Sequence, residues 1–312
     1  MKNFHPRVKC SAFSLNRDEE LKNLLLSVFP EAVIGPTDEN IPLDEFLDFA
    51  SDAEALIVGR EKVDERLFEA APHLKVISKY GVGVDNIDFN ACQAHGVHVL
   101  HATGVNRQCV AELTLGFILA SLHNIVFSDR LLRRGQWVKD GGWDLAGKTV
   151  GIVGFGNVGT QLARLLQPFE VKILVHDILD KTDACKQFLH TQQTDLNTLL
   201  TSSDIVSLHV PLTSLTRKMI AAPQFAIMKT GSILINTARG GILDESDLLN
   251  ALNSGSIRAA CLDVFEEEPL TQHPLLQHPR VITTPHIGGN SREARRAMAH
   301  AAISMLAEYL KI

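Results

Sequence analysis

Short apolar runs alternate with segments of helical periodicity along almost the whole chain. In the first third, runs rich in Val, Ile and Leu predict strands at residues 8–13, 32–34, 55–58, 75–80 and 97–101. Between them, amphipathic segments at 19–29 and 64–71 predict helices. Near-continuous apolar strands separated by helices are typical of parallel sheets that are covered on both faces.

A second series of the same kind follows. It predicts strands at residues 149–154, 171–177, 205–210, 232–237, 259–265 and 281–284. The fold class is therefore predicted as α/β, with two doubly wound parallel-sheet domains in tandem. A strongly apolar helix expected at 110–127 precedes the second series, and we expect it to be buried between domains or at a subunit interface. A last amphipathic helix, at 291–310, is expected to return to the first domain.

Composition narrows the class. The 312 residues suit two domains, and 30 basic against 36 acidic residues give a net charge of −6, so a nucleic-acid partner is not expected. No apolar run reaches the roughly 18 residues of a membrane span, and the first residues do not resemble a signal peptide. Five scattered cysteines without metal-ligand spacing suggest free thiols in the cytoplasm and no metal site.

The strongest local motif is a glycine-rich turn, Gly154-Phe-Gly156-Asn-Val-Gly159, between the strand at 149–154 and a helix expected at 160–167. The first glycine permits a tight turn and the second lets the backbone approach a pyrophosphate. The third lets the helix pack close to the strand. The helix N-terminus then stabilises the anion. The motif predicts a dinucleotide site.

The residue that ends the next strand, Asp177, lies 18 positions beyond Gly159. A carboxylate at this distance is suited to bind the ribose hydroxyls of the adenosine. No arginine adjoins it to receive a 2′-phosphate. The expected cofactor is therefore NAD and not NADP.

Five further motifs resemble those of the D-isomer-specific 2-hydroxyacid dehydrogenases, in order and over nearly the whole chain. They are residues 81–88 (GVGVDNID), 209–216 (HVPLTSLT), 234–241 (LINTARGG), 262–269 (LDVFEEEP) and 284–289 (TPHIGG). Within this family the sequence is most similar to the D-3-phosphoglycerate dehydrogenase branch, in the short form without a C-terminal regulatory domain. The resemblance implies a Rossmann NAD-binding domain at 103–288 and a flavodoxin-like substrate (lid) domain at 1–102 with 289–312, with a cleft between them.

The resemblance assigns three catalytic residues. Arg239 matches the arginine that clamps the substrate carboxylate, for which a permanently charged guanidinium fork is suited. His286 matches the general acid/base, and Glu268 matches the carboxylate that pairs with it and stabilises the imidazolium.

The resemblance also implies the cofactor contacts. Asp263 matches the residue that binds the nicotinamide carboxamide. Backbone-dominated contacts are expected from the other residues of the groove, which are Asn157, Val158, Val210, Pro211, Thr237, Ala238, Arg239, His286 and Gly288.

The resemblance assigns the residues that contact the substrate less definitely than the catalytic and cofactor residues. The loop at 78–83 matches the family's substrate loop, so Lys79, Tyr80, Gly81, Val82 and Gly83 are expected to border the substrate, as is Asn106 of the hinge segment. Lys79 and Arg60 are candidate ligands of a substrate phosphate, and surface cations are the alternative. Tyr80 is expected either to narrow the pocket or to bind substrate through its hydroxyl.

The functional prediction is an NAD-dependent oxidation of 3-phosphoglycerate to 3-phosphohydroxypyruvate, the first step of serine biosynthesis, by a homodimer or homotetramer. The alternative on the same scaffold is a hydroxypyruvate or glyoxylate reductase, because fold-level similarity does not determine the substrate. A binding protein resembling the dinucleotide-sensing corepressors is a third possibility. Turnover of any 2-keto acid would separate it from the enzymes.

Overall fold

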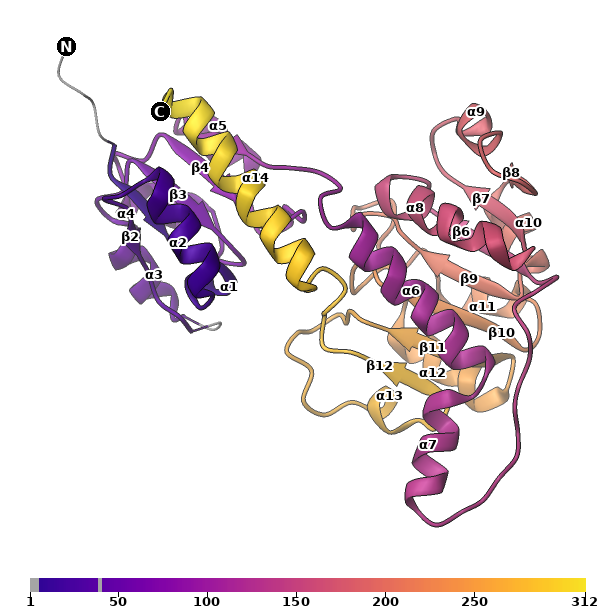
Figure 1. The fold of residues 1–312 in the computed structure, drawn as a ribbon. Coiled ribbons are helices and arrows are strands. Elements are labelled where there is room, and N and C mark those ends of the chain that lie inside the picture. The colour runs from indigo at the N-terminus through magenta and orange to yellow at the C-terminus, as the bar shows by residue number, and fades with distance from the viewer. Residues whose placement is uncertain (1–5, 39–40) are drawn as a thin grey trace. The chain divides into compact units, whose positions relative to one another are not determined.

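Two separate parallel sheets organise the chain in the computed structural model, which describes residues 6–38 and 41–312 (Figure 1). The first unit comprises residues up to 106 together with 290–312, and the second comprises 107–289. The divisions therefore lie at 106/107 and 289/290, where the sequence predicts 102/103 and 288/289. Residues 1–5, where the sequence predicts no signal peptide, lie outside the described residues.

The first unit contains a five-stranded sheet in the order β2-β1-β3-β4-β5, in which all neighbours are parallel. The order is that of flavodoxin-like folds. The strands are β1 (Val8–Cys10), β2 (Val33–Ile34), β3 (Ala55–Val58), β4 (Val76–Lys79) and β5 (His98–Leu100). The helices are α1 (Phe13–Asn16), α2 (Glu19–Val28), α3 (Leu43–Ala50), α4 (Glu65–Ala70), α5 (Phe89–Ala94) and α14 (Arg292–Leu310).

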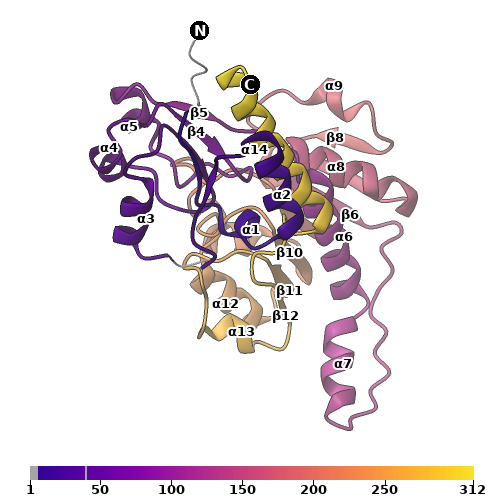
Figure 2. The ribbon, with the colours of Figure 1, turned by 60° about the vertical axis from the view of Figure 1, so that its left-hand side comes forward.

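Alternate residues of the central strand β3 face opposite cores. Ile57 packs in the cluster formed with α2 and α14, whereas Leu56 packs in the cluster formed with α3, α4 and α5. Ser291 caps α14 by accepting from the Ala294 amide at 3.0 Å, and α14 then packs against α2 and β4 (Figures 1 and 2). Burial on both faces explains why the strands of this sheet are almost entirely apolar.

The second unit contains a seven-stranded parallel sheet in the order β12-β11-β10-β9-β6-β7-β8. Its strands are β6 (Thr149–Val153), β7 (Lys172–His176), β8 (Thr191–Gln193), β9 (Ile205–Leu208), β10 (Ser232–Asn236), β11 (Ile257–Leu262) and β12 (Val281–Thr283). Its helices are α6 (Arg107–Leu122), α7 (Ile125–Arg133), α8 (Asn157–Leu166), the 3-10 helix η1 (Gln167–Phe169), α9 (Thr182–Cys185), α10 (Leu196–Ser202), α11 (Ala222–Ile227), α12 (Glu245–Ser254) and α13 (Pro274–Gln277). This is the doubly wound order of a Rossmann fold with an added strand, so the predicted fold class is confirmed.

One prediction of local structure is wrong, and one strand has no counterpart among the predicted elements. The single helix expected at 110–127 is two helices, α6 and α7, bent by 59°. The bend falls at Asn124, whose φ of 54° is left-handed and ends the helical path. The strand β8 was not predicted, because its sequence Thr-Gln-Gln contains no apolar residue.

Among the described residues, no single helix is long and apolar enough to cross a membrane, and only the bent pair α6 and α7 reaches the required length and composition together.

Candidate active site

The strand order of the second unit reverses at β6, which has β7 on one side and β9 on the other. Ligands of doubly wound sheets bind outside the carboxyl ends of the strands at such a point. Gly154 follows β6 with φ of 96°, and a Cβ there would lie 2.8 Å from the carbonyl oxygen of His209, which follows β9. Only glycine therefore allows the two strand ends to approach this closely.

The two other glycines of the turn differ in their surroundings. A Cβ on Gly159 would lie 2.1 Å from the Gly154 carbonyl oxygen, so Gly159 permits α8 to pack on the turn. A Cβ on Gly156 would meet nothing within 4 Å. Gly156 is the N-cap of α8, and Asn157 and Val158 form the first turn of that helix. Open space in front of a helix N-terminus fits a pyrophosphate.

Asp177 directly follows β7 and reaches across to the glycine turn. Its Oδ2 accepts from the Phe155 amide at 2.8 Å, and its Oδ1 accepts from the Leu179 amide at 3.0 Å. The carboxylate is thereby fixed at the edge of the turn, where a ribose would follow the pyrophosphate. These residues fit a bound NAD.

A second group of polar residues lies at the carboxyl ends of β10, β11 and β12. After β10, the Asn236 side chain closes the turn: its Oδ1 accepts from the Ala238 amide at 3.1 Å and its Nδ2 donates to the Arg239 carbonyl at 2.8 Å. Arg239 Nη1 donates to the Ala238 carbonyl at 2.6 Å. Thr237 is buried, and its hydroxyl lies 3.0 Å from that of Thr114 on α6. The arginine is thus held by its own turn.

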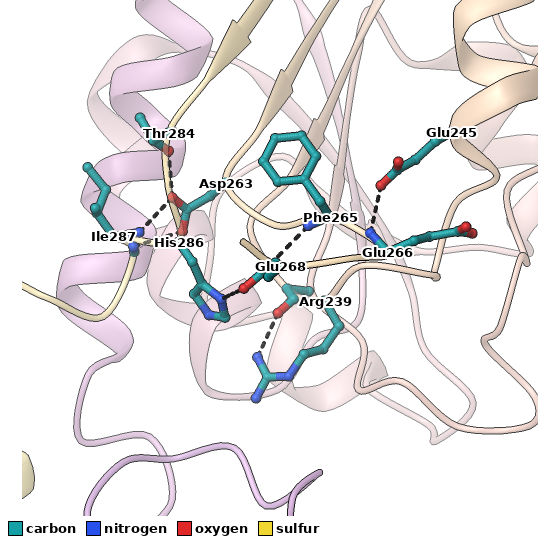
Figure 3. A network of polar contacts seen from close by, with 11 residues as sticks. Arg239, Glu245, Asp263, Phe265, Glu266, Glu268, Thr284, His286 and Ile287 are labelled. Carbon is teal, nitrogen blue, oxygen red and sulfur yellow. Dashed lines mark hydrogen bonds and ion pairs between the residues drawn. The ribbon is translucent and has the colours of Figure 1, made fainter. Parts of the chain in front are cut away.

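Glu268 and His286 form an ion pair. Glu268 Oε2 lies 2.6 Å from His286 Nδ1, and Glu268 Oε1 accepts from the Phe265 amide at 3.1 Å. Both side chains are about one third exposed or less, at 27% and 33%. In Figure 3, the imidazole of His286 and the guanidinium of Arg239 both point away from the strands. With Nδ1 on Glu268, the second ring nitrogen, Nε2, lies on the side of the ring away from that carboxylate.

The turn that carries His286 is built on Asp263. This carboxylate is 1% exposed and accepts from the Ile287 and Gly288 amides, both at 2.8 Å, and from the Thr284 hydroxyl. Burial raises the pKa of Asp263, and these donors oppose the rise. His286 itself has φ of 53°, a left-handed conformation that costs a non-glycine residue about 1–2 kcal/mol. The bonds to Asp263 compensate for that strain.

Backbone contact connects the Arg239 turn to the Glu268 segment. A Cβ on Gly240 would lie 1.7 Å from the Phe265 carbonyl oxygen and 2.7 Å from the Glu266 nitrogen. The two segments therefore touch through their main chains. Gly240 was not identified from the sequence, although its place beside Arg239 in a motif was a usable signal.

The remaining residues predicted to contact the cofactor lie at strand ends of the same unit. Val210 is half-buried and packs against the core, and the Pro211 carbonyl accepts from the Thr216 hydroxyl at 2.5 Å. A Cβ on Gly288 would lie 2.8 Å from Asp263 Oδ2, so this residue permits the close approach of the turn to the carboxylate.

The predicted phosphate ligands lie at strand ends of the first unit. Lys79 is 5% exposed, and its ammonium donates to the Gly59 carbonyl and to Asn86 Oδ1. Burial raises the pKa of Glu61, and the nearby charge of Lys79 opposes the rise. Arg60 is exposed. The Lys79 ammonium is therefore already hydrogen-bonded within its own unit.

The Tyr80 side chain belongs to the core of the first unit. It is 7% exposed and packs in the cluster that contains Met298 and Ala302 of α14. Burial raises its pKa to about 12, and its hydroxyl has no hydrogen-bond partner among the described residues. The roles expected for this side chain, narrowing the pocket or binding substrate, do not fit its position, and only its backbone is left for such a contact.

The other predicted substrate residues stay predictions. Gly81 has φ of 124°, which only glycine adopts readily. Val82 and Gly83 follow it at intermediate exposure, and Asn106 is the last residue before α6.

The fold, the glycine turn and the acid–base pair define the class of a dinucleotide-dependent oxidoreductase. The family model for the NAD-binding domain of the D-isomer specific 2-hydroxyacid dehydrogenases matches residues 115–288. A glyoxylate reductase of Thermofilum pendens is 44% identical over 276 residues, which are 86% of this chain and 81% of that protein. A D-3-phosphoglycerate dehydrogenase of Methanocaldococcus jannaschii is 41% identical over 271 residues, 86% of this chain but 51% of that protein.

A solved structure, that of the TT0316 protein from Thermus thermophilus, has a TM-score of 0.88 at 33% identity and covers 98% of this chain and 97% of that chain. The chain belongs to the D-isomer-specific 2-hydroxyacid dehydrogenases. It is an NAD-dependent oxidoreductase.

Proposed function

We propose that the chain interconverts a short 2-keto acid and its D-2-hydroxy acid at Arg239, Glu268 and His286. The observation that carries the proposal is the contact of 2.6 Å between Glu268 Oε2 and His286 Nδ1. Such a pair orients an imidazole and stabilises its charged form, as a general acid requires. The cofactor, when bound, would supply the hydride to C2 of the keto acid in its reduced form, NADH, or accept it as NAD+ in the reverse direction.

Each side chain has one task in the reduction. Arg239 binds the substrate carboxylate with parallel N–H donors. His286 donates the Nε2 proton to the carbonyl oxygen as C2 receives the hydride, which leaves a hydroxyl group and a neutral imidazole. Glu268 keeps the ring in place through its contact with Nδ1. Asp263 is proposed to bind the nicotinamide carboxamide with the one acceptor position that remains on its Oδ2, and Asp177 to bind the ribose hydroxyls.

For the substrate, we propose an unphosphorylated 2-keto acid, glyoxylate or hydroxypyruvate. Two observations support it: the relative named a glyoxylate reductase is matched over most of its length, and the Lys79 ammonium already bonds Gly59 and Asn86 beside Glu61. A phosphate bound by Lys79 would have to replace these hydrogen bonds.

The second candidate is 3-phosphohydroxypyruvate and its reduced form, as in serine biosynthesis. The relative named a D-3-phosphoglycerate dehydrogenase supports it, as does the exposed cation of Arg60 near the end of β3.

The test is NADH oxidation with glyoxylate, hydroxypyruvate and 3-phosphohydroxypyruvate side by side. A higher kcat/KM for an unphosphorylated acid supports our first candidate. A higher value for the phosphorylated acid, together with a KM that rises for it alone in Arg60→Gln and Lys79→Gln, establishes the second. Lys62→Gln, at an exposed cation of the same unit, is the matched control. No turnover of any 2-keto acid would point to the corepressor-like alternative.

We also propose a homodimer, or a homotetramer built from it, that forms through α7 and the segment after it. No residue of α7 is buried, and Ile125, Leu132 and Trp137 are 55%, 56% and 77% exposed. Figure 2 shows α7 extending away from the sheet of its unit. Exposed apolar surface of this kind marks an interaction site. Light scattering should give at least twice the chain mass, and Leu132→Asp should lower it to one chain. A wild-type monomer would refute the proposal.

A further inference from the structure

Beside the acid–base pair lies a carboxylate that the mechanism above does not use. Glu245, the first residue of α12, is 9% exposed. An acidic residue in the first turn of a helix ordinarily remains in water, where it interacts with the helix dipole. This one is inside the protein, where burial raises its pKa. Its position therefore needs a reason other than helix stability.

The two carboxylate oxygens of Glu245 contact the two ends of one segment, which accounts for its position. Glu245 Oε1 accepts from the Glu266 amide at 2.7 Å, and Oε2 lies 3.5 Å from His273 Nε2. His273 Nδ1 accepts from the Leu275 amide at 3.3 Å, so Nε2 carries the proton that faces Glu245. The segment 266–273 between these two contacts contains Glu268.

The peptide that Glu245 holds is also the peptide on which the site is assembled. It joins Phe265 to Glu266, and its carbonyl side packs against Gly240, next to Arg239. The Phe265 amide in turn donates to Glu268 Oε1. Figure 3 shows this chain of contacts from Glu245 through Glu266 and Phe265 to Glu268 and His286.

Glu245 is itself firmly placed. The preceding residue, Asp244, caps α12 by accepting from the Asp247 amide at 3.0 Å, and its other oxygen lies 2.8 Å from Lys218 Nζ. Leu248, one turn along the helix, is fully buried. A group on a rigid helix positions others more accurately than one on a loop.

We propose that Glu245 is a positioning residue of the reaction, which holds the segment 266–273 so that Glu268 meets His286. The inference rests on the proposed function of that pair. The carboxylate of Glu245 contacts Glu266 and His273, so its loss should reduce the rate of the chemical step and leave NADH binding intact.

The experiment compares Glu245→Ala and Glu245→Gln with the control Glu267→Ala, an exposed residue of the same segment. Glu245→Ala should lower kcat with glyoxylate about 10- to 100-fold, the effect of a displacement of roughly 1 Å. The KM for glyoxylate and the Kd for NADH should stay within about threefold of wild type. The isotope effect with deuterated NADH should increase, because hydride transfer becomes rate-limiting.

Glu245→Gln keeps an acceptor for the Glu266 amide and should recover most of the lost rate, and Glu267→Ala should behave as wild type. If Glu245→Ala does not fold, Glu245→Asp, which withdraws the carboxylate by one methylene, should still lower kcat about 5- to 10-fold. A kcat within about twofold of wild type in the folded variants would overturn the inference. A rate loss that follows weaker NADH binding would overturn it as well.

Two reference variants separate this inference from the proposed function. If Glu268→Ala and His286→Ala both retain wild-type turnover, the proposed function fails. If both lose turnover while Glu245→Ala retains it, only the role of Glu245 fails.

Discussion

A single methyl group at Gly240 should disrupt the site without touching any reacting atom. In Gly240→Ala, the new Cβ would lie 1.7 Å from the Phe265 carbonyl oxygen and 2.1 Å from its carbonyl carbon. These are main-chain atoms and cannot rotate away as a flexible side chain would. Contact distances between nonbonded atoms are about 3.5 Å, so the two segments must separate by roughly 1.8 Å.

The separation has two calculable consequences. Overpacking of a close-packed site costs about 1–3 kcal/mol in the free energy of unfolding. Because Arg239 precedes Gly240 and Glu268 follows Phe265, Arg239 and the pair formed by Glu268 and His286 also move apart. A displacement of this size lowers kcat/KM about 100-fold.

The assay is urea unfolding followed by circular dichroism, together with NADH oxidation by glyoxylate. Gly116→Ala, on an exposed face of α6 where a Cβ meets nothing within 4 Å, is the matched control. It should stabilise the protein by about 0.5–1 kcal/mol, because alanine is the better helix former, and leave activity unchanged. Wild-type activity and stability in Gly240→Ala would refute the packing that we describe.

Three further predictions concern the cofactor end. Gly159→Ala, with a Cβ 2.1 Å from the Gly154 carbonyl oxygen, should weaken NADH binding, and an unchanged Kd in a fluorescence titration would contradict this. Asp177→Ser should weaken NADH binding and lower the ratio of kcat/KM with NADH to kcat/KM with NADPH. An equal ratio in mutant and wild type would refute the ribose contact. Burial lowers the pKa of His209 to about 3, against about 6.5 in an unfolded chain. The unfolded state therefore binds more protons between these values, and stability is lost as the pH falls. His209→Gln should reduce the slope of the free energy of unfolding against pH by at most about 1.4 kcal/mol per pH unit. Identical slopes in mutant and wild type, measured by urea unfolding, would contradict this prediction.

The sheets could be predicted from the sequence because their strands are buried on both faces and are therefore continuously apolar. The strand β8 could not be predicted, because it is a polar edge strand. The prediction also failed at Asn124, where one left-handed residue divides a continuous apolar pattern into α6 and α7. Backbone conformation at a single residue leaves no periodic signal.

The contact between Glu268 and His286 could be predicted because both residues lie in motifs at strand ends. Glu245 could not, since its partners lie 21 and 28 positions away and an acidic residue after Asp244 looks like an ordinary helix start. The direction of the Tyr80 side chain could not be predicted either, because it packs in a core that α14 forms, and α14 lies more than 200 residues later in the chain.

The most direct test of the central claim is the turnover of His286→Ala with glyoxylate and NADH, with NADH binding measured on the same sample. If His286 transfers the proton, kcat should fall by about 10² to 10⁴ while the Kd for NADH is unchanged. Turnover close to wild type in this variant would contradict the role of the pair formed by Glu268 and His286, and with it the proposed mechanism.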